Sequence, residues 1–150
     1  MANYQMAIEH LQNLERINQL KAERPSKEEF EGLTVSGQRR LKDAENEKLS
    51  LESRFDLAYN AAHALSLAAL RWHGYRSNNR YLVFQCLAHT VNLPNEKWRV
   101  LDQAHRKRNL AEYEGIIEID SGLIESIIRA AHEIEVSVLA FGEPENSWAE

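Results

Sequence analysis

Apolar side chains recur every three or four residues along most of this chain, and polar side chains fill the positions between them. This spacing gathers the apolar residues on one face of a helix, and no stretch shows the strict alternation of a half-buried strand. The longest apolar stripe, residues 51–73, is rich in alanine, which allows neighbouring helices to approach closely. The pattern predicts helices over residues 3–24, 26–30, 35–47, 51–73, 80–91, 96–114 and 122–141, while 116–119 is ambiguous.

Capping and breaking residues lie where this pattern changes. Small polar residues that accept a hydrogen bond from the first helical turn are expected to begin the helices. Proline and glycine are expected to end them. The predicted N-caps are Ser26 (with Glu29 in a capping box), Ser50, Asn78 or Asn79, Asn95, and Asp120 or Ser121, and the predicted breaks are Pro25, Gly74, Pro94, Gly115 and Gly142.

A chain of 150 residues, 43% of them hydrophobic, is long enough to bury one core. We therefore predict one all-α domain, a helical bundle of four main helices with N-terminal helical additions. Residues 1–34 are the N-terminal helix and capping segment, 35–141 the bundle, and 142–150 a tail.

Several features of the sequence bear on where in the cell the protein acts. No run of about 18 apolar residues is present, so no membrane span is expected. The first residues lack the basic start and apolar centre of a signal peptide. The single cysteine, Cys86, cannot form an internal disulfide and is expected to be a small core residue. Together these features predict a cytoplasmic protein.

Charge is unevenly distributed in this acidic chain, whose net charge is −5. Residues 54–111 carry 9 basic and 3 acidic side chains, whereas residues 112–150 carry 1 basic and 10 acidic ones. A basic middle segment suggests a surface that attracts anions. The alternative is that the basic segment pairs with the acidic last helix, within the chain or across a dimer.

The segment HRKRNLAEYEG, residues 105–115, is the strongest candidate for chemistry. Arg106, Lys107 and Arg108 are three adjacent cations on one predicted helix, followed by Asn109 and Tyr113. Such a cluster repels itself unless it is solvated or surrounds an anion such as a phosphate.

The order and the sequences of the predicted helices over residues 40–141 resemble those of the HEPN superfamily. The resemblance rests on the alanine-rich helix, on its GYR ending at residues 74–76, and on RNLAEY at 108–113. The family motif is an arginine, four to six residues and a histidine, often with a polar residue after the arginine. Arg108, Asn109 and Tyr113 occupy these positions, so tyrosine replaces the motif histidine; Arg106 also fits, with six residues between.

The resemblance implies a metal-independent endoribonuclease of the toxin or defence type, or a degenerate relative that binds RNA, acting as a homodimer. Arg108 would stabilise the phosphorane charge, and Asn109 would orient the phosphate or the catalytic ring. Tyr113 would donate a hydrogen bond but is a poor base at neutral pH. His105, four residues before Asn109 on the same helix face, could supply an imidazole, or it could be an ordinary surface histidine.

Further basic residues flank the loop YRSNN. With Tyr75 and Tyr81, Arg71, Arg76 and Arg80 could extend a phosphate track, or they could belong to a solvated loop. The histidines do not show the spacing of metal ligands, so no metal or other cofactor is expected. Possible partners are RNA, an antitoxin or another protein. The alternative function is a non-catalytic dimeric helical adaptor or protein-interaction module.

Overall fold

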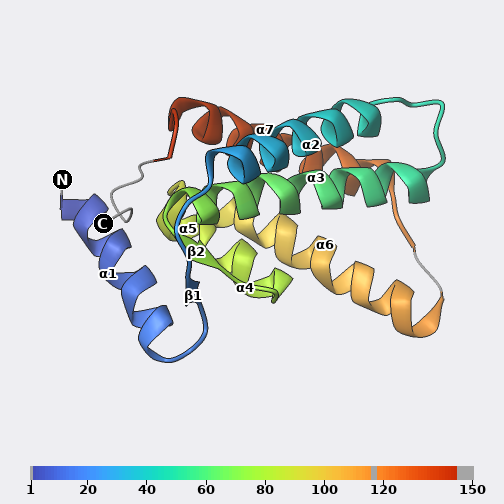
Figure 1. Cartoon of the computed structure of the whole chain (residues 1–150). Helices are drawn as coiled ribbons and strands as arrows, with labels where there is room; N and C mark the ends of the chain where they lie inside the picture. The colour runs from blue at the N-terminus through green and yellow to red at the C-terminus, as the bar shows by residue number, and fades with distance from the viewer. Residues whose placement is uncertain (1, 116–117, 145–150) are drawn as a thin grey trace.

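Helix α3 (Leu51–Trp72) runs through the centre of an all-α helical bundle, shown in Figure 1. The computed structural model describes residues 2–115 and 118–144. Helices α2, α6 and α7 surround α3, while α1, α4 and α5 cover one end of the bundle (Figure 1). The other elements are α1 (Ala2–Arg16), β1 (Lys21–Ala22), α2 (Lys27–Ala44), β2 (Tyr75–Arg76), α4 (Arg80–Gln85), α5 (Leu87–Thr90), α6 (Asn95–Glu114) and α7 (Ser121–Ala140).

Small residues allow α2 and α3 to pack closely. A Cβ atom built on Gly37 of α2 would lie 2.7 Å from Cγ of Leu65 and 3.3 Å from the carbonyl oxygen of Ala61, both on α3. Six alanines of α3 are buried as well. The alanine-rich pattern therefore predicted the central helix correctly, and Gly37 marks the closest approach to it.

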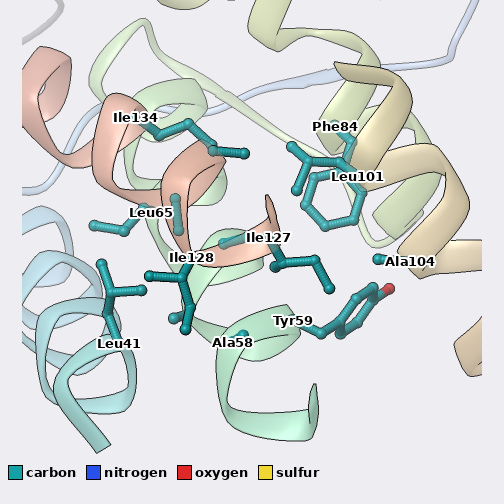
Figure 2. Close-up of a cluster of buried hydrophobic side chains, with 14 of the residues drawn as sticks. Leu41, Ala58, Tyr59, Leu65, Phe84, Leu101, Ala104, Ile127, Ile128 and Ile134 are labelled. Atoms are coloured by element: carbon teal, nitrogen blue, oxygen red, sulfur yellow. The ribbon is translucent and has the colours of Figure 1, made fainter. Parts of the chain in front are cut away.

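The main core fills the space between these helices (Figure 2). Ile127, Ile128 and Ile134 of α7 face Leu65 and Ala58 of α3, as their helical spacing predicted. Figure 2 also shows the hydroxyl of Tyr59 at the edge of this core, directed toward α6 beside Ala104. A second, smaller core joins α1 to α3 and α4 through Leu11, Leu20, Leu70, Tyr75, Leu82, Val83 and Cys86.

The predicted caps are largely confirmed. The side chains of Ser26, Ser50, Asn79 and Asp120 each accept a hydrogen bond from a backbone N–H in the first turn of α2, α3, α4 and α7. Gly115 ends α6 with a φ of 70°, a conformation that favours glycine. Pro94 rather than Asn95 precedes α6, and no side chain caps that end.

Three predicted helices differ from those in the structure. α1 ends at Arg16, because Asn18 takes a positive φ of 61° and the chain then pairs β1 with β2, an antiparallel contact that no alternation predicted. α2 is one continuous helix where two were expected, over 26–30 and 35–47, since its packing against α3 outweighs the low helix propensity of Gly32. The helix expected over 80–91 is divided at Cys86 into α4 and α5.

Arg71, at the end of α3, anchors the N-terminal segment. Its side chain is only 1% exposed, and its Nε lies 2.7 Å from Oε1 of Glu29. The same guanidinium donates to the carbonyl oxygens of Glu23 (2.9 Å) and Arg24 (2.6 Å). Arg71 is therefore a structural cation with its partners supplied by the chain, and the expectation that it joins a phosphate track is wrong.

Candidate functional site

Side chains from α3, α4 and α6 converge where Tyr59 leaves the main core. The hydroxyl of Tyr59 lies 3.0 Å from Nδ1 of His105, and Nε2 of His105 lies 3.3 Å from the amide nitrogen of Asn109. Tyr81 and Phe84 of α4 lie against the same imidazole, with ring centroids 5.7 and 6.4 Å away. His105 is thus held on several sides yet remains partly exposed.

Two arginines lie over the ring of Tyr59. The guanidinium carbon of Arg108 is 5.2 Å from the ring centroid, and that of Arg80 is 5.6 Å from it. Arg80 donates to Oδ1 of Asn60 at 3.0 Å, so its partners among the described residues are neutral. Arg108 forms an ion pair of 3.2 Å with Glu112, one turn further along α6, and that carboxylate is more than half exposed.

The two cations act on the nearby histidines. Burial is the main cause that lowers the pKa of His105 below its usual value, and Arg108 and Arg80 lower it further. Burial also lowers the pKa of His63 to about 4, with added repulsion from Arg80, Arg108 and His105. Both imidazoles are therefore neutral at pH 7. The positive potential of Arg80 and Arg108 at this site would attract an anion.

One tautomer of the neutral His105 ring satisfies both of its hydrogen bonds. With the amide of Asn109 donating to Nε2, the neutral ring carries its proton on Nδ1 and donates it to the oxygen of Tyr59. Burial raises the pKa of Tyr59, which keeps that phenol protonated. Nε2 then has the lone pair of a base, and its contact with Asn109 is long for a hydrogen bond, at 3.3 Å.

The structure brings together five of the residues singled out from the sequence: Arg108, Asn109, His105, Arg80 and Tyr81. It separates Arg106 and Lys107 from them, because successive residues of a helix point about 100° apart. Arg106 pairs with Asp102 at 3.2 Å, and Nζ of Lys107 donates to the carbonyl oxygen of Glu118 at 2.7 Å. The three adjacent cations of the sequence therefore do not form one cluster.

Tyr113 does not reach this site within one chain. It follows Arg108 by five residues, which turns it about 140° around the helix axis. Its side chain is 87% exposed. A role for Tyr113 in the same site would require a second copy of the chain.

Arg76 also lies apart, at the junction of the N-terminal segment with β2. Its Nε is 3.0 Å from a carboxylate oxygen of Glu23, and its other end contacts Glu29. Burial pushes the pKa of Glu29 upward, but hydrogen bonds from Arg76 and Arg71 outweigh it and lower that pKa overall. Because Glu23 and Glu29 together balance the charges of Arg76 and Arg71, the predicted phosphate contact of Arg76 is not supported by this geometry.

Pairing between the basic middle segment and the last helix is limited among the described residues. Arg54 pairs with Glu125 at 3.0 Å, and Lys97 approaches Glu133 at 4.0 Å. The other ion pairs of residues 54–111 in this part of the chain lead to the N-terminal segment or stay within α6. Among the described residues, the last helix therefore forms no ion pair with Arg80 or Arg108.

Sequence reasoning missed Tyr59, Asn60 and His63. The apolar ring of Tyr59 fits the stripe of α3 as a core residue does, and nothing in the stripe shows where its hydroxyl points. The available signal was a polar Asn60 and a His63, one turn apart in the alanine-rich part of the helix. Their partners, Arg80 and Phe84, come from another helix, so the pairing needs the folded chain.

Two further properties concern the part of the chain that the structure describes. No group of three His, Cys, Asp or Glu side chains there is arranged to hold a metal ion. None of its helices combines the length and the apolar character needed to cross a membrane. Comparisons with protein-family models, with curated proteins and with solved structures find no match for this chain.

Proposed function

We infer that the protein binds single-stranded RNA at the junction of α3, α4 and α6 and cleaves it without a metal ion, in the manner that the HEPN resemblance implies. The observation that carries this proposal is the pair Arg80 and Arg108 over Tyr59, beside the neutral imidazole of His105. Guanidinium groups suit phosphate oxygens because their N–H groups form a planar fork.

The chemistry needs few groups, since RNA supplies its own nucleophile. Nε2 of His105 takes the proton of the 2′-hydroxyl, and the resulting oxygen attacks the adjacent phosphorus. The bond from phosphorus to the 5′ oxygen then breaks, leaving a 2′,3′-cyclic phosphate, and the 5′ oxygen takes a proton from water. Arg108 and Arg80 stabilise the additional negative charge of the phosphorane. Asn109 orients either the imidazole or a phosphate oxygen.

In this proposal His105 replaces the motif histidine that Tyr113 displaces in the sequence. Tyr59 supports the role by fixing the tautomer and the orientation of the ring, as the third group of a catalytic arrangement does. The lowered pKa of His105 keeps the base deprotonated at neutral pH. A toxin or defence role, with an antitoxin as partner, follows only from the family resemblance.

A homodimer belongs to the same proposal. The second half of α6 exposes Leu110 and Tyr113. Buried residues of this helix occur only in its first half, at Leu101 and Ala104. In Figure 1 the end of α6 extends away from the other helices. An apolar pair on such a projecting end suits contact with the same helix of a second copy.

The test is incubation of the purified chain with mixed single-stranded RNA in low salt and EDTA. We expect cleavage that Arg108→Ala and His105→Ala abolish and that Arg39→Ala, an exposed position on α2, leaves unchanged. Arg80→Ala should weaken binding and lower the salt slope of log K by roughly 0.7 for each phosphate that it no longer neutralises. Binding that none of these substitutions changes would contradict the proposal.

The second candidate function is a non-catalytic helical adaptor. Exposed apolar side chains on the outer face of α7, Val136 and Leu139, and on α1, Tyr4 and Met6, favour it. An adaptor would bind no RNA at low salt, and Val136→Asp with Leu139→Asp would abolish its protein contact while Arg108→Ala would not.

A further inference from the structure

A pocket of about 470 Å³ opens beside the candidate site, between α1, α4, α5 and the start of α6. This size lies in the range of small-molecule sites, roughly 300–1,000 Å³. Its walls are largely apolar, with Leu14, Leu82, Leu93 and Trp98. Polar groups reach it from Gln85, His89 and Asn95. A planar ring with a polar edge fits such a lining.

The pocket is joined to His105 by aromatic rings. The centroid of Tyr81 lies 5.7 Å from that of His105 and 6.1 Å from that of Trp98, which lines the pocket. Tyr81 and Gln85 are one turn apart on α4. The ring that contacts His105 and a polar group of the pocket therefore lie on the same face of this helix. The rings of Tyr81 and Trp98 are partly exposed. Bases stack on such rings whatever their sequence.

Trp98 also has an unfilled hydrogen-bonding capacity. Its indole N–H is buried, and no acceptor among the described residues receives it. A buried donor without an acceptor destabilises the folded chain. A carbonyl oxygen or ring nitrogen that reached this N–H would supply the missing acceptor.

We propose that this pocket binds one nucleobase of the single-stranded RNA whose phosphate lies at Arg80 and Arg108. Trp98 and the leucines enclose the base, and the amides of Gln85 and Asn95 read its hydrogen-bonding edge. The link to RNA rests on the proposed function. The pocket itself can be tested apart from it, because a free nucleoside carries the base without the phosphate.

The experiment records the indole N–H signals of the full chain by NMR while each of the four ribonucleosides is added to millimolar concentration. Trp98→Phe identifies the signal. We expect at least one nucleoside to shift this signal. Gln85→Ala should weaken the affinity for that nucleoside at least threefold. Gln103→Ala, an exposed glutamine on α6 outside the pocket, is the matched control and should leave the affinity unchanged.

A parallel titration uses a single-stranded RNA octamer and its abasic counterpart. If the octamer binds but no nucleoside moves the Trp98 signal and the abasic strand binds equally well, the base pocket is refuted while the proposed function stands. If nucleosides bind at Trp98 and the octamer does not, the pocket stands and the RNA function falls. Absence of both kinds of binding overturns both.

Discussion

The phenolic oxygen of Tyr59 lies 3.0 Å from Nδ1 of His105 and connects the buried centre of α3 to the exposed face of α6. The ring of Tyr59 has no exposed surface, so its hydroxyl is a rigid support. Its two neighbours over the ring, Arg80 and Arg108, are thereby placed beside the same imidazole. One core residue thus contacts the imidazole and both cations of the candidate site.

Tyr59→Phe should separate these roles. The substitution keeps the ring under both arginines but removes the hydroxyl that orients His105, so RNA affinity should change little while cleavage falls about tenfold. Loss of the bond should also lower the free energy of unfolding by about 1 kcal/mol. Single-turnover kinetics, fluorescence anisotropy and urea unfolding measure the three quantities. Equal losses in affinity and cleavage would show that the hydroxyl does not act through His105.

The pH profile of cleavage should reflect His105. The folded pKa of this imidazole lies below 6.5, chiefly through burial and then through Arg108. The rate should therefore be constant from pH 7 upward and should decline only as the pH falls below 6.5, where the base becomes protonated. An inflection above pH 7 would exclude His105 as the base and would indicate a different proton acceptor.

The projecting end of α6 should control the oligomeric state. Leu110→Asp together with Tyr113→Asp places two charges on exposed positions, so the fold should be preserved while a dimer separates. Light scattering at micromolar concentration gives the mass, and circular dichroism checks the helix content. Gln103→Asp is the control, because it adds a charge to an exposed position in the first half of the same helix. A wild-type mass of 17.3 kDa would contradict the dimer.

Stability should fall as the pH is lowered from 7 toward 4. Burial lowers the pKa of four histidines in the folded chain: His63, His73, His89 and His105. As the pH falls below 6.5, these histidines are therefore protonated in the unfolded chain before they are protonated in the folded one. The contribution of the four neutral histidines to stability is lost over this range. His132 acts oppositely: burial lowers its pKa, but hydrogen bonds to Glu45 and Glu135 outweigh that effect and raise the pKa overall. Its contribution is present below pH 6.5 and is lost as the pH rises through the raised value.

Thermal unfolding at pH 7, 6 and 5 measures this balance. Four histidines with lowered pKa values oppose one with a raised value, so the melting temperature should decrease steadily over this range. His132→Gln should make the decrease steeper, since it removes the one opposing contribution. A melting temperature that rises between pH 7 and pH 5 would show that other groups dominate the pH dependence.

The sequence predicted the fold well where local signals agree with packing. The apolar stripes of α3 and α7 and the caps at Ser50 and Asp120 were all visible, because helical spacing and capping are local properties. The pairing of β1 with β2 was not, since two residues per strand leave no pattern to detect. Only part of the candidate site could be predicted from the sequence. Arg108 and Asn109 belong to one motif, whereas Tyr59 contributes only through a fold that joins positions 46 residues apart.

Gly37 and Gly32 offer a test of how closely α2 and α3 are packed. Both glycines lie inside α2, but a Cβ at Gly37 would lie 2.7 Å from the side chain of Leu65 on α3, whereas one at Gly32 would meet no atom within 4 Å. Alanine favours a helix over glycine by about 1 kcal/mol, so Gly32→Ala should stabilise the chain by roughly that amount. Gly37→Ala gains the same propensity but must displace Leu65, and overpacking of this kind costs about 1–3 kcal/mol. Urea unfolding should therefore show the two substitutions moving the midpoint in opposite directions. Stabilisation by both would mean that Leu65 relocates freely and that the contact between α2 and α3 is looser than the geometry indicates.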